Sequence, residues 1–239
     1  MVTRDLRGMA TAVAVVLAAV MASGCSVKLV KRSQADTERL AALSQEVDTL
    51  RELNKQQGQE TDSLRTAKQE LEAQLAKEIA DKQVSVGLND RGLVITFLAE
   101  ILFDSGKAKI RREAQPVLDK VAKVLNADVP NQQIGIEGHT DNEPIKRSGW
   151  KSNWELSTAR AISVLHYIVD EKDVAPQRVS AIGYGEYRPV TANDTKEGRQ
   201  QNRRVEIVVL PQQMTKVKAQ AAKADTAAVE APVVTEGSK

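Results

Sequence analysis

The pattern of apolar and polar positions divides the chain into segments of different character. Residues 9–21 form a run without charged side chains, and residues 40–82 contain mostly Glu, Gln, Lys, Ala and Leu. From residue 83 to residue 210, short runs that alternate polar and apolar residues are separated by longer amphipathic runs. This order predicts an apolar leader, a helical spacer and one α/β domain.

Strand and helix signals alternate within the segment 83–210. It begins with a hairpin pattern, in which residues 84–88 and 93–97 flank a turn at residues 89–92. Further strands are predicted at 133–137, 178–182 and 203–210, and helices at 112–126 and 155–170. Such alternation predicts an α/β sandwich with helices packed on one face of a small mixed sheet. Residues 211–239 show no periodicity and are expected to be disordered.

The spacer 40–82 has a heptad pattern whose inner positions are partly apolar. The apolar inner positions are Leu40, Leu43, Val47, Leu50, Leu64, Leu71 and Leu75. Two structures fit this pattern: a parallel coiled coil between copies of the chain, and a single helix stabilised by Glu–Lys pairs. The leucine spacing favours the coiled coil, which would make the protein a homo-oligomer. Asn54 at an inner position would weaken such a coil while fixing its register.

The leader has the features of an export signal. Arg4 and Arg7 precede the charge-free run, which is too short for a membrane span of about 20 residues. Residues 22–25, Ala-Ser-Gly-Cys, resemble a lipobox, although leucine is usual at the position of Ala22. This resemblance implies removal of a signal peptide 1–24 and lipidation of Cys25, the start of a linker 25–39. Ser26 in place of an aspartate favours sorting to the outer membrane.

Composition excludes several classes of function. The net charge of +2 shows no basic field for nucleic acid, and the single cysteine excludes an intrachain disulfide. The only histidines are His139 and His166, so the residue clusters of zinc sites are absent and His139 is interpreted as a loop-packing residue. Ser157 has no nucleophile setting, and residues 104–107 lack the spacing of a phosphate loop. We therefore expect neither an enzyme nor a bound cofactor or metal.

A carboxylate and a guanidinium mark the candidate site. Asp141 follows the predicted strand 133–137, and Arg160 lies on the apolar-striped helix 155–170. If the strand and the helix pack together, the two groups face one pocket from two walls. Such a pocket would bind a ligand that carries both an ammonium and a carboxylate. An exposed ion pair between these residues is the alternative, worth only about 0–1 kcal/mol.

The segment 84–210 resembles the OmpA C-terminal-like family of peptidoglycan-binding domains. The matching residues are Phe103-Asp104, Gly138-His139-Thr140-Asp141-Asn142, Asn153 with Leu156-Ser157 and Ala159-Arg160-Ala161, Gly183-Tyr184-Gly185, and Asn202-Arg203-Arg204-Val205-Glu206. The resemblance implies noncovalent binding of the diaminopimelate side chain of a peptidoglycan stem peptide, mainly by Asp141 and Arg160.

The same resemblance implies the rest of the cleft. Its further residues are Thr140, Asn153, Leu156, Arg203, Ser105 and Gly106. Strand alternation sends one of Arg203 and Arg204 to the cleft and the other away, and the family match favours Arg203. The loop 143–154 resembles the stator type and contains Trp150 and Trp154. These rings either stack on a glycan or, the reading we favour, pack the loop.

Two functions fit these observations. The first is an outer-membrane lipoprotein whose periplasmic domain binds peptidoglycan and tethers the membrane to the cell wall. The second is a stator-like or secretion-associated subunit held in the inner membrane by an uncleaved N-terminal helix. A stator requires an acid within its membrane span, and residues 9–21 contain none.

Overall fold

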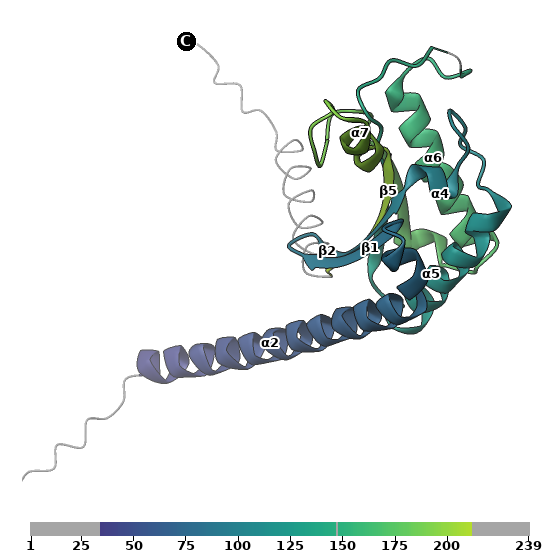
Figure 1. Ribbon diagram of the computed structural model, residues 1–239. Coiled ribbons are helices and arrows are strands. Elements are labelled where there is room, and N and C mark those ends of the chain that lie inside the picture. Colours follow the sequence, from purple (N-terminus) through teal and green to yellow (C-terminus); the bar gives the residue numbers. More distant parts are fainter. Residues whose placement is uncertain (1–33, 147, 212–239) are drawn as a thin grey trace, which may run out of the picture. The chain divides into compact units, whose positions relative to one another are not determined.

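The computed structural model describes residues 34–146 and 148–211 (Figure 1). The expected signal peptide 1–24, Cys25, the first part of the linker and the tail 212–239 lie outside the described residues. Among the described helices, none is both long and apolar enough to cross a membrane.

The predicted spacer is helical. Helix α2 (Gln34–Gln74) is followed by α3 (Ala76–Ala80). The chain divides into two compact units after Glu52, and α2 contributes to both. In the first unit Leu43 and Leu50 are 55% and 57% exposed. Their pairing with a second chain remains a prediction.

The C-terminal part of the heptad pattern belongs to the globular domain. Leu64, Leu71 and Leu75 are buried in the same hydrophobic cluster as the sheet and its helices. These positions are therefore already occupied by the chain's own core, and the core begins well before residue 83. The seam available to a second chain is confined to the part of α2 that precedes Leu64.

The sheet is small and mixed. Its strands are β1 (Val84–Asn89), β2 (Gly92–Leu98), β3 (Gln133–Gly138), β4 (Val179–Gly183) and β5 (Arg204–Leu210). They lie in the order β1-β2-β5-β3-β4, with β3 and β4 parallel and the other neighbours antiparallel. The predicted strands and the α/β fold class are confirmed.

Helices α4 (Ala99–Leu102), α5 (Gln115–Ala127) and α6 (Asn153–Asp170) contribute to one core with the sheet. Alternate strand residues such as Ile95, Ile136 and Ile207 point into this core, as strand periodicity requires. Short helices η1 (Arg112–Ala114) and η2 (Pro176–Arg178) precede α5 and β4. Helix α6 begins two residues before its predicted start, because the Ser152 hydroxyl accepts the Glu155 amide and caps it.

Helix α7 (Lys196–Asn202) was not predicted. It is seven residues long and polar, so it has no apolar stripe that reveals it in the sequence. The hydroxyl of Thr195 caps it by accepting the Gly198 amide at 3.0 Å. This helix leads directly into Arg203 and β5, so it sets the position of one wall of the cleft described below.

Two glycines bring helix α6 against the ends of the parallel strands. A Cβ at Gly138, the last residue of β3, would collide with the carbonyl oxygen of Ser157. A Cβ at Gly183, the last residue of β4, would collide with Thr158. Only glycine permits this close approach. The loops that follow β3 and β4 therefore both start beside the N-terminal half of α6.

Candidate functional site

An open cleft of about 440 Å³ lies where the loops after α4 and β3 meet α6 and the start of β5. Every predicted binding residue lines it, namely Ser105, Gly106, Thr140, Asp141, Asn153, Leu156, Arg160 and Arg203. The fold therefore brings residues up to 98 positions apart in the sequence (203 − 105) to one cleft. Whether these residues bind a ligand remains a proposal.

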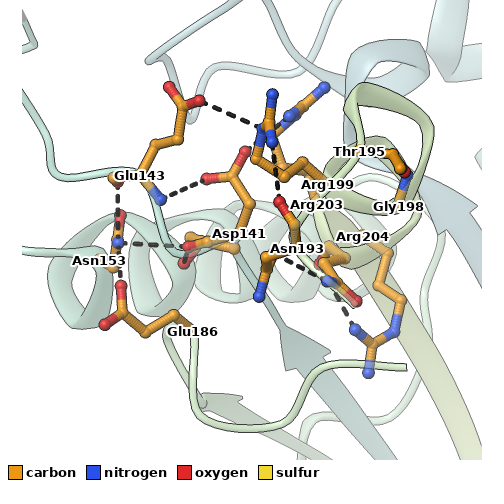
Figure 2. A network of polar contacts seen from close by, with 12 residues as sticks. Asp141, Glu143, Asn153, Glu186, Asn193, Thr195, Gly198, Arg199, Arg203 and Arg204 are labelled. Carbon is orange, nitrogen blue, oxygen red and sulfur yellow. Dashed lines mark hydrogen bonds and ion pairs between the residues drawn. The ribbon is translucent and has the colours of Figure 1, made fainter. Parts of the chain in front are cut away.

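Asp141 is oriented by two neighbours. Its side chain is nearly buried, and Oδ2 accepts a hydrogen bond from Nη1 of Arg203 at 2.6 Å. Oδ1 accepts the backbone amide of Glu143 at 3.2 Å. Both contacts appear in Figure 2, where Asp141 faces the end of α7. They hold the carboxylate in a fixed orientation within the cleft.

Asn153 fixes the loop that carries Asp141. Its side-chain amide donates to the backbone oxygens of Asp141 (3.3 Å) and Glu143 (3.1 Å) and to Oε2 of Glu186 at 2.7 Å. The hydroxyl of Thr140 donates to the same Asp141 oxygen at 2.9 Å. Asn153 and Thr140 thus position the loop in this structure. Figure 2 shows the contacts of Asn153.

Arg160 is a buried cation. Its side chain is 4% exposed, Nε donates to the backbone oxygen of Lys107 at 3.0 Å, and the guanidinium lies 5.3 Å from the centre of the Phe103 ring. No carboxylate of a described residue lies within ion-pair distance. Burial, and then repulsion by Arg203, lower the pKa of Arg160 to about 10, although Asp141 opposes this. A ligand carboxylate would relieve the cost of this unpaired charge.

The two consecutive arginines separate as predicted. Arg203 lines the cleft and pairs with Asp141, whereas Arg204 is buried and donates through Nε to Glu206 at 2.6 Å. Arg199 of α7 forms a second ion pair, with Glu143, at 3.2 Å. The sequence did not reveal this pair or Glu186, because Glu143 and Glu186 lie in polar loops and Arg199 lies in a short polar helix without an apolar stripe.

The two tryptophans have different environments. The indole of Trp150 donates to the backbone oxygen of Gly106 at 2.8 Å, which ties the loop 143–154 to the opposite rim of the cleft. The loop-packing interpretation therefore holds for Trp150. Trp154 is 48% exposed and stacks on Tyr187, so loop packing does not describe it.

A cluster of ionisable residues lies outside the cleft. Glu137 and Glu206 face each other across β3 and β5, and both pair with Arg91 from the β1–β2 turn. His139 stacks on Tyr184, and its Nε2 lies 3.8 Å from Glu137, too far for a hydrogen bond. Two carboxylates and an imidazole could offer ligands to a metal, but the arginines already compensate the carboxylates. Adjacent like charges would otherwise destabilise the sheet.

Comparison with known proteins identifies the family. The model of the OmpA family matches residues 102–203. Motility protein B of Bacillus subtilis is 43% identical over 145 residues, which cover 59% of this chain and 55% of that protein. Outer membrane protein Omp38 of Acinetobacter baumannii is 42% identical over 105 residues, which cover 44% of this chain and 28% of that protein.

A solved structure agrees with these relatives. The cell wall anchor of the T6SS from Pseudomonas aeruginosa is 37% identical with a TM-score of 0.54, and the match covers 59% of this chain and 96% of that chain. By contrast, the chain spans about half the length, 55% and 52%, of the first two curated relatives that it matches. Matching residues, fold and relatives agree that the chain belongs to the OmpA family and carries an OmpA-like peptidoglycan-binding domain.

Proposed function

We propose that the cleft binds the diaminopimelate side chain of a peptidoglycan stem peptide. The observation that carries this proposal is the pair of nearly buried, opposite charges on two walls of one cleft, Asp141 and Arg160. Diaminopimelate ends in an ammonium and a carboxylate on one carbon atom. The ammonium pairs with Asp141 and the carboxylate with Arg160, so that each charge of the ligand meets one of opposite sign.

Arg203 keeps Asp141 ready for the ligand. Because Oδ2 of Asp141 already accepts from Arg203, the carboxylate keeps its orientation when the cleft contains no ligand. The incoming ammonium shares this carboxylate with Arg203 or takes its place. Arg203 is 35% exposed and lines the cleft, so it has room to turn toward the ligand carboxylate.

For the whole chain, we propose a membrane-anchored cell-wall anchor of the stator-like or secretion-associated kind. This proposal is supported by the similarity to Motility protein B and to the cell wall anchor of the T6SS, and by the long loop that carries Trp150. In this arrangement the domain 83–210 and the segment of α2 that packs on it hold the wall. The N-terminal region supplies the attachment to the membrane.

A second candidate is an outer-membrane lipoprotein. It is favoured by one observation, the sequence Ala-Ser-Gly-Cys at 22–25 directly after a charge-free run. Incorporation of labelled palmitate into the wild type but not into Cys25→Ala, with the protein in the outer-membrane fraction, would favour this candidate. A mature chain that still carries Arg4 would exclude it.

The shared binding function is tested by co-sedimentation with isolated sacculi. Charge-assisted hydrogen bonds contribute about 1.5–3 kcal/mol each, so Asp141→Ala and Arg160→Ala should each weaken binding about 10- to 150-fold. Matched controls are Asp90→Ala and Arg112→Ala, which remove exposed charges outside the cleft. Arg204 is unsuitable as a control, because it is buried and paired with Glu206. Folded site variants that sediment with sacculi like the wild type would refute the assignment.

A further inference from the structure

Two aromatic rings lie side by side on the surface near the cleft. Trp154, in the first turn of α6, stacks on Tyr187, in the loop after β4, with ring centres 5.1 Å apart and planes inclined by 23°. Their side chains are 48% and 64% exposed. Large rings usually stabilise a fold by being buried, so a pair that is ordered and yet exposed contributes little to the core. We call this pair the aromatic platform.

A polar network joins the aromatic platform to the cleft. Asn153 and Glu186 each precede one of the two rings in the sequence, and they are bonded to each other at 2.7 Å. Asn153 also donates to the backbone of Asp141. The turn that leads to Tyr187 is held at Gly185, whose carbonyl oxygen accepts the Thr140 amide at 2.9 Å. The residues that position Asp141 therefore also position the platform.

We propose that the aromatic platform binds a sugar ring of the glycan strand to which the stem peptide is attached. The inference rests on the proposed function, because a stem peptide held in the cleft is covalently joined to that glycan. A pyranose presents a face of polarised C–H groups, which packs against the electron-rich face of an aromatic ring. Its hydroxyl and acetamido N–H groups lie at the ring edge, where the Glu186 carboxylate accepts hydrogen bonds.

The surroundings favour a sugar over a hydrophobic protein segment. Protein partners generally dock on apolar patches of several hundred Å². Here the two rings are bordered by Asn153, Glu186 and the exposed Glu155. A narrow aromatic surface with a polar border matches one amphipathic sugar ring, whose faces are apolar and whose edge is polar.

The test uses the full chain and two separate probes. The first probe is peptide-free glycan strands, made by amidase digestion of sacculi and immobilised on beads. The second is a soluble stem peptide containing diaminopimelate. The variants are Trp154→Ala and Tyr187→Ala, with Ile162→Ala as a control that removes another exposed apolar side chain of α6. Circular dichroism verifies the fold of each variant.

We expect the wild type to bind both probes. Each platform variant should bind the glycan about 2- to 12-fold more weakly, with peptide affinity unchanged, and Ile162→Ala should behave like the wild type. Asp141→Ala should bind the peptide more weakly and the glycan with unchanged affinity. If Asp141→Ala kept its peptide affinity while the platform variants lost glycan binding, the proposed peptide site would be wrong. The proposal that the aromatic platform binds glycan would still be supported.

Three results would contradict the proposal that the aromatic platform binds glycan. The first is a wild type that does not bind peptide-free glycan, and the second is glycan binding like that of the wild type by both platform variants. In a third case Tyr187→Ala would reduce self-association in sedimentation equilibrium without changing glycan binding. That result would identify the rings as a contact between copies of the chain.

Discussion

Replacing Arg160 by methionine separates a ligand-binding role from a structural one. The guanidinium is buried, and its contacts with described residues are the Lys107 carbonyl oxygen and the face of the Phe103 ring. A buried charge without an ion-pair partner destabilises the folded state. Methionine has a similar length and no charge, so it can fill the same space without that cost.

The expected change in the free energy of unfolding follows from the pKa of Arg160. Burial, with repulsion by Arg203, lowers the pKa of Arg160 to about 10. At 1.36 kcal/mol per pH unit, the folded state loses about 3 kcal/mol by keeping this side chain charged. The variant gives up one hydrogen bond, about 1 kcal/mol, and a cation–π contact of about 0.5–1 kcal/mol. Arg160→Met should therefore raise the free energy of unfolding by about 1 kcal/mol.

The assay combines urea denaturation, followed by circular dichroism, with calorimetry of the soluble stem peptide. We expect the variant to unfold at a higher urea concentration and to bind the peptide about 10- to 150-fold more weakly. Arg112→Met, at an exposed position outside the cleft, should change neither quantity. If Arg160→Met were destabilised by more than 1 kcal/mol and still bound the peptide normally, Arg160 would be a structural residue and the reasoning would be wrong.

Three further changes test the fold around the site. Leu64→Asp should destabilise the domain by about 3 kcal/mol or more in urea denaturation, because it places a charge in the core, whereas Leu43→Asp, at an exposed position, should weaken only self-association in sedimentation. Gly138→Ala should cost several kcal/mol, because its Cβ would strike the Ser157 backbone, and normal stability would refute that packing. Burial lowers the pKa of His139 below 6.5, so the unfolded state binds more protons there and stability should fall as the pH drops through this range; His139→Phe should flatten this slope.

The elements predicted from sequence were those with a clear period. Alternation marked every strand, and the apolar stripe marked α5 and α6, so the positions of Asp141 and Arg160 on adjoining elements followed. Their convergence on one cleft could be inferred because consecutive strands and helices pack against each other. Helix α7 carried no such signal, since its seven polar residues depend on a cap rather than on an apolar face.

The heptad stripe of α2 was ambiguous for a physical reason. An apolar face on a helix shows that something covers it, but not whether the cover is a second chain or the same chain. At Leu71 and Leu75 it is the chain's own core. The pairing of Trp154 with Tyr187 was equally hidden, because the rings belong to separate elements and meet only through the close packing of α6 on the end of β4.

The most direct test of the proposed binding site compares two soluble stem peptides that differ only in their third residue. One contains diaminopimelate and the other contains lysine, which keeps the ammonium but lacks the second carboxylate. The wild type should bind the diaminopimelate peptide at least about tenfold more tightly in calorimetry, since one charge-assisted contact is lost with lysine. Arg160→Met should abolish this difference, and Asp141→Asn should weaken both peptides. Equal affinity of the wild type for the two peptides would contradict the proposal that Asp141 and Arg160 together bind a zwitterion.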